Sequence, residues 1–215
     1  MSVPQHIGII PDGNRRWAKE NDLNKEDGYI YGLAPGLQLL KLCQKTGVQE
    51  LTYYGFTMDN TKRKNVQTQA FTKACVEAVK MITQEDAELL VVGNTKSPKF
   101  PQELLPYTKQ RTTFGSGGIK VNFLVNYGWH WDLSNLEENE KASKKGIISA
   151  LQSSQISRID LIIRWGNRRR LSGFLPAQSV YADFYVVDKY WPDFAPADFY
   201  KALEWYKQQD ITLGG

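Results

Sequence analysis

The residues best suited to chemistry stand directly after an apolar run near the start of the chain. The run HIGIIP (6–11) is followed by DGNRRW (12–17), which holds one carboxylate and two guanidiniums. Arginine binds phosphate through paired, charge-assisted hydrogen bonds, and Gly13 lets the backbone approach a ligand closely. Backbone N–H groups at the start of the next helix add a positive end. On this segment alone, an ordinary turn with Asp12 or Asn14 as helix cap and the arginines in solvent is an equal alternative.

Polar groups follow later apolar runs in the same way. The run at 50–56 is followed by polar residues up to Arg63, and the run at 158–165 leads into a stretch that reaches Ser172. Two arginine groups indicate two separate binding sites for polyanions. Asp12 beside so many cations is explained if one ligand is a diphosphate carrying Mg²⁺, which takes one or two carboxylates plus phosphate oxygens. The two groups are Arg15, Arg16 and Arg63, and then Arg164 and Arg170.

Other chemistries lack their sequence signals. Neither GxxxxGK[ST] nor GxGxxG is present, which argues against a Walker-type nucleotide site and a dinucleotide site. With two cysteines and two histidines, a zinc cluster is not expected. Cys43 and Cys75 form no CxxC pair and fall in helical patterns, so we interpret them as reduced core residues.

Length and composition set the class of protein. The 215 residues predict a single domain, 1–215, large enough for a core with a tunnel or cleft beside it. No apolar run approaches the roughly 18 residues of a membrane span, and the start lacks a signal-peptide pattern, so we expect a cytoplasmic location. The net charge is +4, and the basic residues are split among strand ends instead of forming one stripe, so nucleic acid is not the expected partner.

The apolar pattern predicts an α/β fold. Strand-like runs alternate with helix-like segments, which favours a mostly parallel central sheet flanked by helices on both faces. Ligands of such sheets bind beyond the carboxyl ends of the strands, where the polar groups above would meet. The expected strands are 6–11, 50–56, 88–94, 119–127, 158–165 and 180–188, and the expected helices lie near 30–46, 66–84, 101–112, 130–155 and 196–209.

Two diphosphate sites, one metal and an apolar interior together indicate chemistry on an isoprenoid diphosphate. The metal and the arginines would draw off the leaving diphosphate, and a second substrate would attack the allylic cation that remains. The enzyme would mainly position the reactants and stabilise charge.

Five segments are similar to the motifs of one family, in order along about 200 residues. They are HIGIIPDGNRRWAKE, LTYYGFTMDNTKR, VNFLVNYGWHWDL, DLIIRWGNRRRLSGFLPAQSVYADFY and WPDF. With these, the chain resembles the cis-prenyltransferase family of the undecaprenyl diphosphate synthase type, as a divergent member. The resemblance implies a transferase of isoprenoid biosynthesis with an α/β fold, a hydrophobic tunnel and a homodimer or heterodimer, of which we expect the homodimer. It also implies contact with a membrane surface for product release.

The resemblance assigns roles to individual residues. Asp12 corresponds to the metal-binding catalytic aspartate, Asn60 to a catalytic asparagine of the mobile loop, and Asp183 to a glutamate that shares the Mg²⁺. The remaining matched positions would bind the two prenyl diphosphates. These are Gly13, Asn14, Arg15, Arg16, Trp17, Lys25, Tyr29, Thr57, Met58, Asp59, Thr61 and Arg63 for the first site and its loop, and Arg164, Arg170, Leu171 and Ser172 for the second.

The departures from the family gather around the second substrate. Tyr29 replaces a histidine near the first diphosphate, and Thr61 replaces the loop tryptophan. The changes expected beside the second diphosphate are Trp165, Asn167 and Arg168, which replace a small residue, a glycine and a glutamate. Other departures are Lys64, Pro176 and Ala177, and the end DITLGG, which lacks the arginine pair that a partner subunit can contribute.

These departures favour one condensation, or few, with an unusual acceptor. The expected acceptor is a second allylic diphosphate such as dimethylallyl diphosphate, giving a branched, lavandulyl-like product; an alcohol is a second option. Two alternatives stay open: a regular cis-polyprenyl diphosphate synthase that uses isopentenyl diphosphate, and a non-catalytic subunit of a two-component enzyme. The intact DGNR loop (12–15) argues against the non-catalytic subunit.

Overall fold

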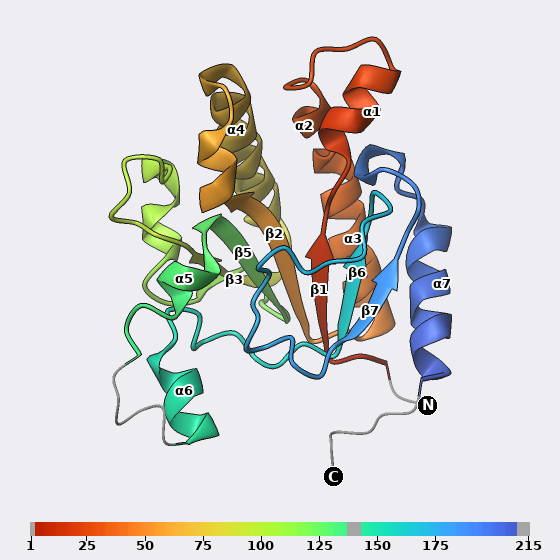
Figure 1. Ribbon diagram of the computed structural model, residues 1–215. Helices are drawn as coiled ribbons and strands as arrows, with labels where there is room; N and C mark the ends of the chain where they lie inside the picture. Colours follow the sequence, from red (N-terminus) through yellow and green to blue (C-terminus); the bar gives the residue numbers. More distant parts are fainter. Residues whose placement is uncertain (1–2, 137–142, 210–215) are drawn as a thin grey trace.

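The computed structural model describes residues 3–136 and 143–209, which form a twisted sheet covered mainly by helices on one face (Figure 1). Over these residues seven strands hydrogen-bond in the order β4-β3-β5-β2-β1-β6-β7. All neighbouring strands are parallel except β4, which runs antiparallel to β3. The strands are β1 (His6–Ile10), β2 (Glu50–Thr57), β3 (Ala87–Val92), β4 (Thr112–Phe114), β5 (Ile119–Tyr127), β6 (Leu161–Arg164) and β7 (Asp183–Val186). The predicted α/β class with a mostly parallel sheet is confirmed.

Helices lie in most of the crossover connections between parallel strands, but the segment between β6 and β7 contains none. They are α1 (Asn14–Glu20), α2 (Gly28–Tyr31), α3 (Leu33–Thr46), α4 (Asn65–Ile82), α5 (Trp129–Asp132), α6 (Lys144–Ala150) and α7 (Pro196–Lys207), with short 3₁₀ helices η1 (Met58–Lys62), η2 (Gln102–Tyr107) and η4 (Trp191–Asp193). Among the described residues, no helix is long and apolar enough to cross a bilayer.

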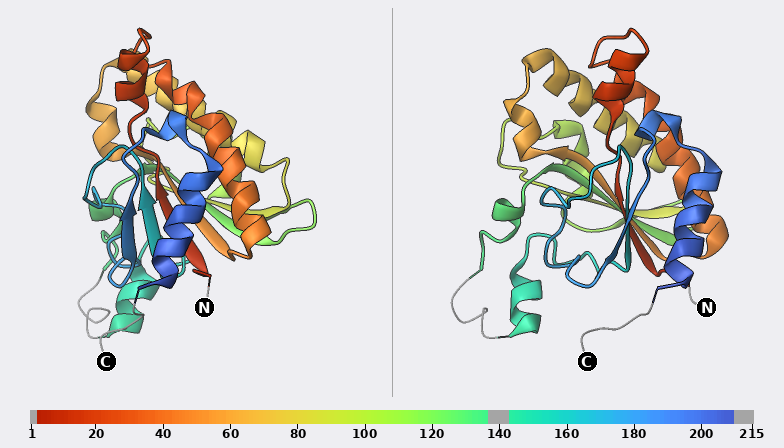
Figure 2. Two further views of the ribbon diagram at one scale, coloured as in Figure 1. Left: turned by 90° about the vertical axis from the view of Figure 1, so that its right-hand side faces the viewer. Right: turned by 45° about the vertical axis from the view of Figure 1, so that its right-hand side comes forward.

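The two faces of the sheet are covered differently (Figures 1 and 2). Alternate strand residues such as Ile7 and Ile9 pack in a large core that includes residues of α3, α4 and α7. The other face carries a smaller cluster, in which Ile10 packs with Phe174 and residues of irregular segments. Helices on both faces were predicted, but this second face is covered mostly by non-helical chain around 151–182.

Several predicted boundaries were wrong. The expected helix at 101–112 is only the 3₁₀ helix η2, which is followed by β4 at the sheet edge. The expected helical segment 130–155 contains two short helices, α5 and α6, and its residues 137–142 lie outside the described residues, as does the DITLGG end at 210–215. Cys43 and Cys75 are buried free thiols, as predicted.

Candidate active site

Asp12 lies just beyond the carboxyl end of β1, between two arginines from distant parts of the sequence. Its Oδ2 accepts a hydrogen bond from Nη2 of Arg164 at 2.7 Å, and its Oδ1 is 3.4 Å from Nη2 of Arg16. Arg164 also donates from Nη1 to Oγ of Ser172 at 3.0 Å and to the carbonyl of Arg170. Because β1 and β6 are parallel neighbours, both arginine groups predicted from the sequence meet at this one carboxylate.

Helix α1 begins immediately after this carboxylate. Gly13 adopts φ +106° at the helix start, and a Cβ there would lie 2.6 Å from the Tyr190 ring. The alternative in which Asp12 or Asn14 caps the helix is wrong: no side chain caps α1, and Asn14 donates from Nδ2 to the carbonyl of Pro11 at 2.8 Å. Nε of Arg15 is buried without a partner among the described residues, which leaves it available to a ligand.

The end of β2 holds a second set of polar groups. Thr57 Oγ1 accepts from the backbone N–H of Asn60 at 3.2 Å, and Asn60 Oδ1 accepts from the backbone N–H of Thr57 at 3.1 Å. This reciprocal cap fixes η1, so the amide NH₂ is the group that Asn60 offers to the pocket. Arg63 donates from Nη1 to the hydroxyl of Tyr29 at 2.9 Å.

These groups line one open pocket of ≈ 570 Å³, which contains seven cationic side chains and two carboxylates. Fourteen of the predicted site residues lie there. They are Asp12, Gly13, Asn14, Arg15, Arg16, Lys25, Tyr29, Thr57, Asp59, Asn60, Arg63, Arg164, Arg170 and Ser172. A polyanion is the ligand that such an excess of positive charge attracts.

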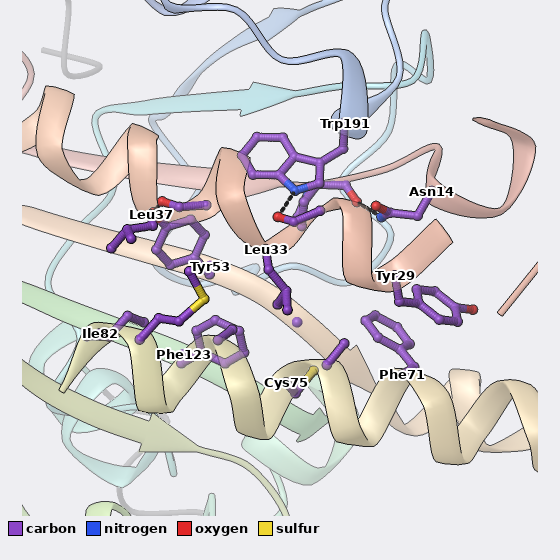
Figure 3. Close-up of a pocket in the computed structure, with 17 residues that line it drawn as sticks. Asn14, Tyr29, Leu33, Leu37, Tyr53, Phe71, Cys75, Ile82, Phe123 and Trp191 are labelled. Carbon is purple, nitrogen blue, oxygen red and sulfur yellow. Dashed lines mark hydrogen bonds between the residues drawn. The ribbon is translucent and has the colours of Figure 1, made fainter. Parts of the chain in front are cut away.

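A narrow apolar cavity of ≈ 80 Å³ adjoins this pocket, between α3, α4 and the sheet (Figure 3). Its walls include Leu33, Leu37, Phe123 and Ile82. The cavity and the polar pocket have five lining residues in common, which mark the junction between them. These are Pro11, Asn14, Tyr29, Gly55 and Phe71.

Tyr29 places a hydroxyl group at this junction. Its ring stacks on Phe71 with centroids 4.4 Å apart, and its hydroxyl points away from the apolar residues in Figure 3. Burial raises the pKa of Tyr29, although the charges of Arg63 and Arg15 oppose the rise. The phenol is therefore neutral near pH 7, and since its oxygen accepts from Arg63, its proton can be donated into the pocket.

Five predicted site residues lie outside the pocket. Trp17 donates from Nε1 to Asp193 at 2.6 Å, and Thr61 donates to the carbonyl of Met58. Leu171 packs against the smaller core cluster. Asp183 pairs with Leu161 at the start of β6, whereas Arg164, the partner of Asp12, is at its end. The structure therefore separates Asp183 from Asp12 along the strand direction within one chain, and the predicted sharing of one Mg²⁺ is not supported by this placement.

Sequence reasoning missed several lining residues. Lys19 follows Arg15 by four positions on α1, a spacing that places both on one face and could have indicated it. Tyr54 and Phe71 also line the pocket. Tyr54 is nearly buried and donates to the carbonyl of Ser172 at 2.8 Å, so it also positions the loop after β6.

The loop after β6 corrects one expectation about the second substrate. Trp165 is fully buried and packs on Trp191 and Phe194 in the large core, away from the pocket. Asn167 adopts φ +53°, the left-handed region that asparagine tolerates better than most residues, and it takes the place of a glycine. The changed volume at Trp165 was expected beside the second diphosphate, and this expectation was wrong. Arg168 and Arg170 are exposed on this loop.

The chain matches known proteins over nearly its whole length. A family model described as putative undecaprenyl diphosphate synthase matches residues 10–214. The chain belongs to this family. The isoprenyl transferase of Clostridium perfringens is 31% identical over 99% of this chain and 90% of its own length. The ditrans,polycis-undecaprenyl-diphosphate synthase of Buchnera aphidicola, specific for (2E,6E)-farnesyl diphosphate, is 28% identical over 98% and 91%.

A solved structure confirms the fold of this cis-prenyltransferase. Lavandulyl diphosphate synthase from Lavandula x intermedia, crystallised with dimethylallyl diphosphate, superposes with a TM-score of 0.86. It covers 99% of each chain at 21% sequence identity. As a member of the family, the protein is a transferase that condenses prenyl diphosphates.

Proposed function

We propose that this prenyltransferase joins a short allylic prenyl diphosphate to a second prenyl diphosphate and accepts an unusual second substrate. One observation carries the proposal: a strongly cationic pocket opens onto a narrow apolar cavity through shared lining residues. A prenyl diphosphate has a polyanionic head and an apolar tail. Its breaking C–O bond would then lie at the junction, beside Asn14 and Tyr29.

Each of the two diphosphates is bound by its own group of arginines in this proposal. Arg15, Arg16 and Arg63 hold the diphosphate that leaves, and Arg164 with Arg170 holds the diphosphate of the second substrate. Fixed cations aimed at the leaving oxygens stabilise charge without reorganisation during the reaction. Tyr29 donates a further hydrogen bond from the junction. The apolar cavity keeps water from the allylic cation.

The residues fit a magnesium ion only in combination with substrate. Asp12 is one partly exposed carboxylate, and no three Asp, Glu, His or Cys side chains gather elsewhere in the described part of the chain. Mg²⁺ commonly binds one or two carboxylates and takes its other ligands from phosphate and water. Asp12 would hold the ion, which when bound supplies positive charge to the departing diphosphate.

The size of the cavity supports short prenyl groups. A dry cavity of about 150 Å³ is known to accommodate one benzene molecule. At ≈ 80 Å³, the cavity beside this pocket holds only a few carbons unless its walls move. An undecaprenyl chain, as made by the relative from Buchnera, is far longer.

The surroundings of the second substrate support an unusual acceptor. Arg168 replaces an acidic residue of the family, Asn167 replaces a glycine, and Thr61 replaces a tryptophan of the loop. Displacing a reacting carbon by about 1 Å can cost about a hundredfold in rate, so repeated elongation should be weak. A second allylic diphosphate is the proposed acceptor. Dimethylallyl diphosphate, the molecule bound to the structural neighbour, is the first to test.

Product analysis decides between this proposal and a regular polyprenyl synthase, which the names of the relatives favour. The purified protein is incubated with Mg²⁺ and dimethylallyl or geranyl diphosphate, with and without isopentenyl diphosphate. Product formed without isopentenyl diphosphate supports the irregular coupling. Strict dependence on isopentenyl diphosphate with a ladder of long products supports the regular synthase, and no product in any mixture supports the non-catalytic subunit.

We also propose that the protein is a homodimer. Val180 and Tyr181, in the run before β7, are exposed, and such apolar surface commonly marks an interface. Light scattering at micromolar concentration should give about twice the mass of one chain, and a monomeric mass would contradict the proposal. The cytoplasmic location and the contact with a membrane surface stay predictions.

A further inference from the structure

One wall of the apolar cavity is the indole of Trp191 (Figure 3). Its N–H donates to the carbonyl of Gly32 at 2.9 Å, which ties η4 to the start of α3. A Cβ on Gly32 would lie 2.8 Å from Cδ1 of this ring, so the indole lies directly against the backbone there. The position of Trp191 therefore limits how wide the cavity is beside Leu33.

The indole of Trp191 packs against a second indole, that of Trp165. Trp165 meets Trp191 edge-to-face with ring centroids 4.9 Å apart, and Phe194 contacts both rings at 5.6 Å. Trp165 is fully buried, yet it does not line the cavity. Its indole therefore contacts the cavity wall through Trp191.

The indole N–H of Trp165 has no hydrogen-bond partner among the described residues. Burying an unpaired N–H costs free energy, so polarity does not account for tryptophan at this position. Its volume does, because protein interiors are close-packed and a smaller residue would leave space behind Trp191.

We propose that Trp165 sets the length of the prenyl group that the cavity accepts, by preventing Trp191 from retreating toward the core. Trp165 is in this sense a positioning residue that determines specificity, and it has no direct part in the chemistry. The inference rests on the proposed function, since it assumes that the cavity receives the prenyl tail. It would let a residue that does not line the polar pocket distinguish this chain from relatives that make long products.

The test compares binding of unreactive donors of increasing length. S-thiolodiphosphate analogues of dimethylallyl, geranyl and farnesyl diphosphate are titrated calorimetrically into the full chain in the presence of Mg²⁺. We expect the preference for dimethylallyl over farnesyl to fall at least tenfold in Trp165→Ala and by less in Trp165→Leu and Trp165→Phe. Trp205→Ala is the matched control, because Trp205 packs on Tyr185 and lines none of the cavities described here.

A double variant distinguishes an effect of Trp165 that acts through Trp191 from a general loosening of the core packing. If Trp165 acts through Trp191, then Trp165→Ala adds nothing to the preference once Trp191→Ala is present. Additive effects, or an unchanged preference in any Trp165 variant that still melts cooperatively, overturn the inference while leaving the proposed function intact. Failure of all three analogues to bind the wild-type chain overturns the proposed function and this inference with it.

Discussion

The central strands carry a cluster of polar side chains at each end. The two clusters differ in how many of their polar atoms have hydrogen-bond partners. At the amino-terminal end, the carboxylate of Glu50 accepts hydrogen bonds from Asn122, Arg111 and Ser157. The donor atoms lie 2.7, 3.3 and 2.8 Å from the carboxylate oxygens, respectively. Asn122 is fully buried and uses its amide on Glu50 and Thr52. The charged groups Glu50 and Arg111 are thus paired with each other and with hydrogen-bonding side chains.

At the carboxyl-terminal end the bonding is incomplete. Nε of Arg164, Nε of Arg15 and Oδ1 of Asn14 are buried without partners among the described residues. Asn167 and Ser172 adopt positive φ in the loop after β6. Unpaired polar atoms and strained backbone cost free energy, and they persist where a ligand or a reaction requires them. The comparison indicates that the amino-terminal cluster around Glu50 and Asn122, here the closed cluster, stabilises the fold. The carboxyl-terminal cluster around Asp12 and Arg164, here the open cluster, keeps polar atoms available to a ligand.

Replacing the carboxylate of the open cluster should have the largest effect on turnover. Asp12→Asn keeps the shape but loses the charge that balances Arg164 and that we propose holds Mg²⁺. We expect turnover to fall on the order of a hundredfold or more, with a native circular-dichroism spectrum. Glu204→Gln, which removes a comparable charge from the outer surface of α7 where it pairs with Lys207, is the control. Near wild-type turnover of Asp12→Asn in Mg²⁺ would refute the proposed metal role.

Breaking the closed cluster should instead reduce stability. Glu50→Ala removes the carboxylate that pairs with Arg111 and accepts from Asn122 in a buried setting, which costs about 3 kcal/mol of unfolding free energy. Turnover per folded molecule should remain that of the wild type. Urea denaturation and steady-state assays below the transition measure the two quantities. Glu77→Ala removes only a surface pair with Lys80 and should leave stability close to that of the wild type. A loss of turnover in folded Glu50→Ala would mean that the two ends are coupled.

The open cluster was more accessible to sequence reasoning than the closed one. Asp12, Arg15 and Arg164 could be predicted because parallel strands bring their carboxyl ends to one edge, and the family motifs cover that edge. Glu50 lies inside an apolar run, and no sequence pattern shows that Asn122 and Arg111 would meet it. Such pairings depend on strand register, which the sequence does not reveal directly.

Side-chain direction was the other source of error. Arg164 is the last residue of β6 and Trp165 follows it directly, so their side chains point to opposite faces of the sheet. The motif match placed both beside the second diphosphate, but only Arg164 reaches Asp12. Asp183 shows a similar limit. Its match to a family position did not reveal that it lies at the amino-terminal end of β7, opposite the start of β6.

Removing one hydroxyl from the junction should have a smaller effect on turnover than removing Asp12. Tyr29→Phe keeps the stacking on Phe71 but deletes the group that accepts from Arg63 and donates into the pocket. Hydrogen bonds to charged groups contribute about 1.5–3 kcal/mol, so kcat/KM should fall roughly tenfold to a hundredfold. An unchanged kcat/KM would show that the Tyr29 hydroxyl does not contact substrate. Tyr31→Phe, on an exposed ring of α2, serves as the control.

The smallest effect concerns pH and again separates the two ends. His6 is buried in the closed cluster, where Nε2 lies 2.7 Å from Oγ1 of Thr52, and burial lowers its pKa below 6.5 although the charge of Glu50 opposes this. The unfolded chain then binds a proton near pH 6 that the folded chain does not. Stability is therefore full above pH 6.5 and declines as the pH falls through this value, by at most about 1.4 kcal/mol per pH unit.

Urea denaturation between pH 7.5 and 5.0 tests this, since few carboxylates titrate in that window. The unfolding free energy of wild type should fall with pH, while that of His6→Gln, lower at the outset, should stay nearly flat. His130→Gln, at an exposed histidine, is the control variant. Parallel slopes for wild type and His6→Gln would mean that His6 keeps its ordinary pKa. A flat slope in His6→Gln alone assigns the pH dependence of stability to the closed cluster.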